Sequence, residues 1–211
     1  MEKSLKEFSI LKKEYPKAHY YLDFRTPFQL LVGTILSAQC TDERANMVLQ
    51  ELFRKYKGLE DFARMNISRL ESEIRSAGFY KSKAKGIQGS AKIILERFKG
   101  KVPDTMDDLV TLPSVGRKTA NAILQNAFNK VEGIVVDTHV IRLSQRLGWS
   151  KSSDAAKIEQ DLMRMFPKKE WGKLPHVLKA HGRNVCKAPV PLCSKCVLNK
   201  LCPKVGVTKS K

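Results

Sequence analysis

The sequence has no hydrophobic run long enough to cross a membrane. A transmembrane helix needs about 20 consecutive apolar residues, whereas the most apolar stretch, Leu30–Ala38, is shorter and contains Gly33, Thr34 and Ser37. The N-terminus also lacks the charged segment followed by an apolar core that marks a secretion signal, because Met1–Lys6 leads into an amphipathic pattern. We therefore expect a cytoplasmic protein that does not associate with membranes.

Acidic residues are scarce relative to basic ones. The 211 residues include 39 Lys and Arg against 21 Asp and Glu, which gives a net charge of +18 at pH 7. Such a surface field attracts polyanions. An anionic membrane surface would fit the charge alone, but the missing apolar segments favour nucleic acid as the partner.

The chain also lacks sustained alternation of apolar and polar residues, internal repeats and long linkers. Apolar residues recur instead at helical spacing, and they make up enough of the sequence to supply a core. Only Gly133–Val136 is typical of a short extended segment. The expected helices cover Ser4–Tyr15, Pro27–Gln39, a stretch from Asp42, Leu59–Met65, Ile67–Ala77, Ser82–Phe98, a short stretch from Pro103, one from Lys118 and one from Asp137. We therefore predict an all-α protein.

A tight hairpin between two helices is predicted around Leu112–Ala120. Pro113 ends one helix, Gly116 allows a backbone conformation closed to other residues, and Lys118 lies at the start of the next helix. A helix that begins at such a turn directs unpaired N–H groups and the positive end of its dipole outward. The segment is either an ordinary turn or a phosphate-binding site, and in so basic a chain the phosphate would belong to nucleic acid.

Cysteine is rare in the first 185 residues and clustered after them. Cys40 stands apart, where we expect a core or turn residue. The other four follow the spacing C-x6-C-x2-C-x5-C, which indicates a shared metal site in a reducing compartment. Four thiolates can hold zinc or a [4Fe–4S] cluster, and the single close pair favours the cluster over a zinc knuckle. The four candidate ligands are Cys186, Cys193, Cys196 and Cys202.

Together, the hairpin and the cysteines resemble the endonuclease III family of helix-hairpin-helix DNA glycosylases. The resemblance covers almost the whole chain, and its motifs are specific in their order and separation rather than one by one. The motifs are Leu36–Asp42, Gly78–Ala84, Leu112–Leu124, Val135–His139 and the four-cysteine end.

The resemblance implies two domains with a DNA-binding cleft between them. Residues 21–130 would form a six-helix domain that contains the hairpin. Residues 1–20 and 131–211 would form a second domain of terminal helices with the iron–sulfur cluster, whose role would be structural. The expected partner is double-stranded DNA containing damaged bases or abasic sites, bound by a monomer.

The same resemblance identifies two catalytic residues. Lys118 occupies the family's nucleophile position, where a lysine amine attacks C1′ of the damaged nucleotide and forms a Schiff base. Asp137 matches the family's essential aspartate, which stabilises positive charge developing on the sugar. A solvated surface lysine and a plain helix N-cap are the alternative interpretations of these two residues, and capping is compatible with catalysis.

The resemblance also implies that further residues bind DNA. Gln39 and Phe79 align with the residues that fill the gap left by a flipped base, although each could instead be an ordinary core or surface residue. Val115 and Gly116 belong to the phosphate-binding turn. His139 is either a phosphate contact or a structural histidine. In addition, Ser114 replaces the first glycine of the family's Gly-Val-Gly hairpin.

The resemblance therefore implies a bifunctional DNA glycosylase and AP lyase. It would excise oxidised pyrimidines from duplex DNA and nick the abasic site by β-elimination in base excision repair. A mismatch-specific monofunctional glycosylase of the same superfamily is the nearest alternative, but such enzymes generally carry another residue where Lys118 stands. A catalytically silent DNA-binding module is the alternative from another class.

Overall fold

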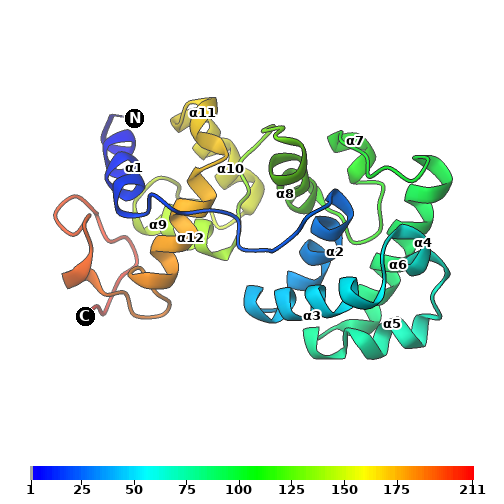
Figure 1. Cartoon of the computed structure of the whole chain (residues 1–211). Coiled ribbons are helices and arrows are strands. Elements are labelled where there is room, and N and C mark those ends of the chain that lie inside the picture. Colours follow the sequence, from blue (N-terminus) through cyan, green and yellow to red (C-terminus); the bar gives the residue numbers. More distant parts are fainter. Residues whose placement is uncertain (1) are drawn as a thin grey trace. The chain divides into compact units, whose positions relative to one another are not determined.

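The computed structural model describes residues 2–211, and their regular structure is helical (Figure 1). No β-strand occurs in this range, which confirms the predicted all-α class. The chain divides into two compact units. One unit is Tyr21–Lys130, and the other joins the segment that ends at Tyr20 to Val131–Lys211.

The central unit, Tyr21–Lys130, is organised around one buried helix. This helix, α2 (Pro27–Ser37), begins at an N-cap where the Thr26 side chain accepts from the Gln29 N–H. It packs against α3, α6 and α8. The other helices of the unit are α3 (Asp42–Lys55), α4 (Leu59–Arg64), α5 (Ile67–Glu73), the 3-10 turn η1 (Arg75–Ala77), α6 (Tyr80–Arg97), α7 (Met106–Leu109) and α8 (Arg117–Phe128).

The other unit is built from both ends of the chain. Its core includes Phe8, Trp149 and Phe166, whose rings pack edge to face. The Trp149 Nε1 also donates a hydrogen bond to the buried Glu7 carboxylate at 2.8 Å. The helices are α1 (Glu2–Glu14), α9 (Thr138–Arg146), α10 (Ala155–Met165), α11 (Lys168–Trp171), α12 (Leu174–Asn184) and the 3-10 turn η2 (Cys193–Lys195).

Some predicted helix starts differ from the observed ones by one to three residues. Thr41, the residue before the predicted start at Asp42, is the N-cap of α3, since its hydroxyl accepts from the Arg44 N–H at 3.2 Å. Thr105 caps α7 in the same way, so this short helix begins after Pro103. Neighbouring Thr and Asp residues are both good caps, and the local pattern does not choose between them.

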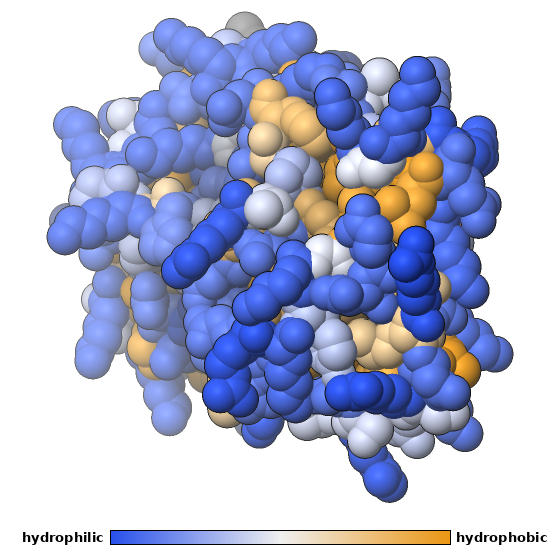
Figure 2. Space-filling model, turned by 45° about the vertical axis from the view of Figure 1, so that its right-hand side comes forward, coloured by the Kyte–Doolittle hydropathy of each residue, from blue (hydrophilic) through white to orange (hydrophobic). Residues whose placement is uncertain are grey.

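The surface agrees with the composition. Figure 2 shows a face covered mainly by hydrophilic side chains, with apolar surface confined to separate patches. Within residues 2–211, we find no helix with the length and hydropathy needed to cross a bilayer.

Candidate functional site

The predicted hairpin is present, but its strained residue is not the expected one. Gly116 has φ −91° and ψ 176°, an ordinary extended conformation, and it caps α8. The left-handed conformation belongs instead to Ser114, at φ 63°. The expectation that Gly116 supplies an unusual backbone angle is therefore wrong, because the chain reverses two residues earlier.

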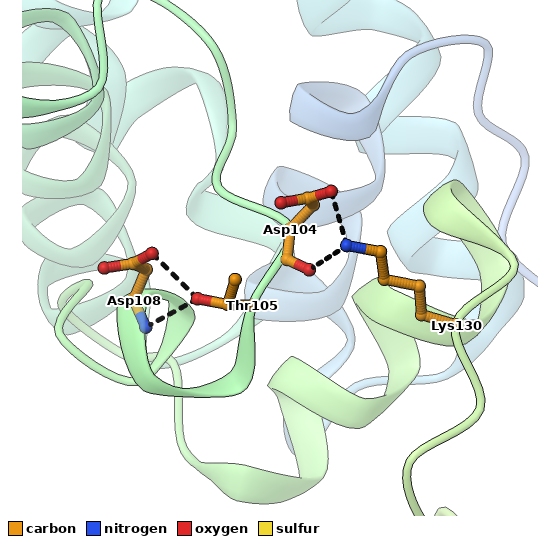
Figure 3. A network of polar contacts seen from close by, with 4 residues as sticks. All are labelled: Asp104, Thr105, Asp108 and Lys130. Carbon is orange, nitrogen blue, oxygen red and sulfur yellow. Dashed lines mark hydrogen bonds and ion pairs between the residues drawn. The ribbon is translucent and has the colours of Figure 1, made fainter.

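The open end of the hairpin is closed by a polar network (Figure 3). After the end of α8, the Lys130 Nζ donates to the carboxylate of Asp104 at 2.5 Å and to its carbonyl at 2.9 Å. Asp104 directly precedes the Thr105 cap of α7. The network thus fixes the outer ends of the two hairpin helices relative to each other.

The N-terminal turn of α8 is exposed and positively charged. Among residues 2–211, no side chain caps this helix end, so its first N–H groups can bind an anion. Lys118 is the second residue of the helix and is exposed to solvent. The turn therefore presents backbone N–H groups and a lysine amine at the same surface.

Gln39 and Phe79 lie at two exposed turns of the central unit, each in the left-handed region. Their φ angles are 53° and 47°, respectively. The Phe79 side chain is 68% exposed, which is unusual for a residue that normally joins the core. Left-handed non-glycine residues are unfavourable, and they concentrate at functional sites.

Asp137 is the N-cap of α9, as the capping interpretation expected. One carboxylate oxygen, Oδ1, accepts hydrogen bonds from the backbone N–H groups of His139 and Val140, both at 2.9 Å. These bonds fix the direction of the carboxylate at the start of the helix.

His139 is half-buried between α9 and α12. Its Nδ1 lies 3.2 Å from the guanidinium of Arg142, and burial is the main cause that lowers its pKa. Gly182 of α12 makes room for this packing, since an added Cβ would lie 2.8 Å from the His139 Nδ1. The ring is therefore held in place by its neighbours.

All four clustered cysteines line one cavity. The remaining lining is largely apolar and includes Leu143, Leu147 and Val185. Within residues 2–211, no three or more His, Cys, Asp and Glu side chains are placed to share one metal ion. A single zinc ion binds each cysteine sulfur at about 2.3 Å from the metal, so its ligands must lie close together. A cluster of four irons is wider, and its cysteine ligands therefore lie farther apart.

Hydrogen-bond donors around these sulfur atoms suit thiolates. The Leu198 N–H lies 3.4 Å from the Cys196 sulfur, and the Lys204 N–H lies 3.3 Å from the Cys202 sulfur. Burial raises the pKa of Cys196, the hydrogen bond from the Leu198 N–H partly offsets this, and the charge of the neighbouring cysteines raises the pKa further. Four thiolates at one cavity repel one another unless a positive group offsets them, so the residues fit a cluster.

Sequence reasoning missed Arg146, which contacts the first cysteine. Its guanidinium donates to the Cys186 sulfur at 3.4 Å and to the Lys187 and Pro189 carbonyls at 2.8 and 3.0 Å. The packing of α9 against α12, which ends just before the cysteine loop, brings it there, and no local pattern signals this contact.

Comparison with known proteins decides the family. The model of the HhH-GPD superfamily of base excision DNA repair proteins matches residues 32–168, which is more than half of the chain. The chain belongs to this superfamily.

Individual members of the HhH-GPD superfamily match over most of their length. Endonuclease III of Synechocystis is 51% identical over 194 residues, which cover 92% of this chain and 89% of that protein. Endonuclease III of Bacillus subtilis is 46% identical, over 89% of this chain and 86% of that protein. The recognised resemblance to the endonuclease III family is therefore confirmed.

Solved structures confirm the fold. A trapped covalent intermediate of endonuclease III with DNA, described as an estranged-adenine complex, matches with a TM-score of 0.90 and 40% identity over 96% of each chain. A non-covalent endonuclease III–DNA complex matches with the same TM-score and identity. A thermostable thymine-DNA glycosylase, 22% identical with a TM-score of 0.81 over 96% of this chain and 95% of that one, supports the fold alone.

Proposed function

We propose that this HhH-GPD protein is a bifunctional DNA glycosylase and AP lyase that removes oxidised pyrimidines from duplex DNA. The glycosylase and AP lyase class follows from its endonuclease III relatives. The observation that carries the bifunctional activity is the exposed Lys118 on the first turn of the hairpin helix. A 40% identical relative has also been trapped as a covalent intermediate with DNA.

Lys118 would act as the nucleophile. Its neutral amine attacks C1′ of the damaged nucleotide, a C–N bond forms, and the glycosidic bond breaks with its electron pair leaving on the base. Opening of the sugar ring then gives a Schiff base. Loss of a proton from C2′ expels the 3′ phosphate, and this β-elimination nicks the strand.

Asp137 would stabilise the positive charge that develops on the sugar as the base leaves. The two N–H bonds to its Oδ1 hold the carboxylate in one direction, so little reorganisation is needed at the moment of reaction. Its capping role and its catalytic role use the same orientation.

The remaining contacts would position the DNA. Val115 and Gly116 lead into the uncapped end of α8, whose N–H groups would bind a phosphate. Gln39 would face the orphaned base and Phe79 would act as an apolar wedge at the gap. Since the Nδ1 of His139 faces Arg142, a phosphate contact by this residue would use Nε2.

We further propose that Cys186, Cys193, Cys196 and Cys202 hold a [4Fe–4S] cluster. When bound, the cluster supplies iron–sulfur bonds that join the loop after α12 into one rigid structure. The chain's own residues already direct N–H groups and the Arg146 guanidinium at the sulfur atoms. No step of base excision uses these residues.

A nicking assay separates the proposal from its alternatives. The substrate is a duplex with one oxidised thymine, analysed with and without alkali after the reaction. The proposal predicts nicking without alkali. Nicking only after alkali would show a monofunctional glycosylase, and no product despite measurable DNA binding would show a silent binding module.

A further inference from the structure

Lys83 is a buried cation in a protein whose other lysines are mostly solvated. It lies on α6, its exposed fraction is only 5%, and burial lowers its pKa. Charged lysines are almost never fully buried unless they are paired, because removing the charge from water is costly. An apolar side chain would fill the same space without the cost of desolvating a charge. The burial of Lys83 therefore requires another explanation.

The Lys83 ammonium joins two helix ends. Its Nζ donates to the Leu36 carbonyl at 2.8 Å and to the Ala77 carbonyl at 2.7 Å. Leu36 lies in the last turn of α2, and Ala77 is the last residue of η1. Carbonyls at helix C-termini lack partners within the helix and carry the negative end of the dipole, so a cation stabilises both.

Each carbonyl lies two or three residues before the left-handed residue of one of the two strained turns. Gln39 follows Leu36 by three residues, and Phe79 follows Ala77 by two. Besides these two left-handed residues, Gly78 has φ 67°. Such conformations persist only where the surrounding structure holds them. Lys83 binds one carbonyl shortly before each turn. In the Gln39 turn, the backbone bonds from the Ala38 N–H to the Ile35 carbonyl and from the Cys40 N–H to the Ser37 carbonyl hold the chain as well.

We infer that Lys83 is a positioning residue that holds the Gln39 turn and the Phe79 turn in register with each other. The inference rests on the proposed function, in which both side chains act at the gap left by one flipped base. If Gln39 and Phe79 both fill the gap left by the same flipped base, the distance between them must be fixed. Lys83 provides this link through its two hydrogen bonds and touches no DNA.

The first test replaces the cation with Lys83→Met, with Lys92→Met as the matched control on an exposed position of the same helix. The readout is the fluorescence of 2-aminopurine, placed as the orphaned base opposite a stable abasic analogue. The intact protein is expected to change this signal on binding. Lys83→Met is expected to reduce the change to about that of Phe79→Ala and to slow base excision by about 10- to 100-fold, since small misplacements have such effects.

A double variant distinguishes positioning from general stability. If Lys83 acts through Phe79, Lys83→Met combined with Phe79→Ala loses little more signal than either change alone. Additive losses, or a wild-type signal and excision rate in folded Lys83→Met, would overturn the inference.

A second substitution covers the case in which Lys83→Met does not fold. Lys83→Gln keeps N–H donors, but its shorter side chain cannot reach both carbonyls, so the signal is expected to fall while circular dichroism is unchanged. A wild-type signal in Lys83→Gln would contradict the inference. Borohydride trapping of the intact protein on an abasic duplex tests the proposed function separately, because it does not depend on Lys83.

Discussion

A Cβ atom added to Gly86 would lie 2.2 Å from the Oγ of Ser114 and 2.8 Å from its Cβ. Glycine at position 86 of α6 therefore allows the hairpin turn to approach the helix closely. The next nearest atom, the Pro113 carbonyl oxygen, lies at an ordinary 3.8 Å. Ser114 alone accounts for the clash.

Gly86→Ala is therefore expected to destabilise the protein, although alanine normally favours a helix. The overlap should cost about 1–3 kcal/mol, as overpacking does. In the double variant with Ser114→Gly both clashing atoms are gone, and stability should return to at least the wild-type value. Urea denaturation of the four proteins measures this, and a double variant no more stable than Gly86→Ala would refute the contact.

Gly116→Ala separates folding from DNA binding. The backbone angles of Gly116 suit any residue, and an added Cβ meets no atom within 4 Å in the described structure. The melting temperature should therefore stay the same or rise slightly. DNA affinity should fall if a phosphate approaches this backbone closely, which fluorescence anisotropy measures. Unchanged affinity would argue against phosphate binding at this turn.

His176 gives the stability a defined pH dependence. Burial, followed by the charges of Lys179 and His19, lowers its pKa to about 4, while Asp137 raises it. In the unfolded chain the ordinary value is about 6.5, so between these values the unfolded state binds a proton that the native state does not. This contribution is complete above pH 6.5 and is lost as the pH falls towards 4, by at most about 3 kcal/mol.

The check is the free energy of unfolding of the wild type and of His176→Gln between pH 4 and 7. The variant should lose less stability on acidification than the wild type. Parallel curves for the two proteins would show that His176 does not contribute.

Removal of one cysteine tests the proposed cluster site. Cys196→Ala or chelation should unfold the region after α12, because the loop there has little regular structure besides η2. We expect a lower melting temperature and loss of the visible absorption of iron–sulfur bonds. Wild-type circular dichroism and melting temperature in Cys196→Ala would contradict a structural cluster.

Sequence reasoning succeeded where a local pattern carries the information. Asp137 precedes a helix whose first N–H groups need acceptors, so its capping follows from the sequence. The cysteine spacing likewise indicated one shared site, and the four side chains line a single cavity. Proline and glycine around Ser114 marked the hairpin, though not which residue is strained.

Residues whose role depends on distant segments were not predictable. Lys83 lies in a basic helix, so the sequence alone predicts a solvent-exposed side chain. Its burial depends instead on its contact with the end of α2, 47 residues earlier. Helical spacing places Leu5 on the same face as Phe8 and Leu11, but Leu5 is 36% exposed, whereas Glu7 is buried beside Trp149. Such outcomes are set by tertiary packing, which overrides local periodicity.

Borohydride trapping on a duplex with an abasic site tests the central claim, that Lys118 forms a Schiff base with the opened sugar. The intact protein should give a covalent protein–DNA band. Lys118→Ala and Lys118→Arg should lose the band while still binding DNA, and the arginine variant also keeps the charge. A band of undiminished intensity in either variant, or no band with the intact protein, would contradict the account.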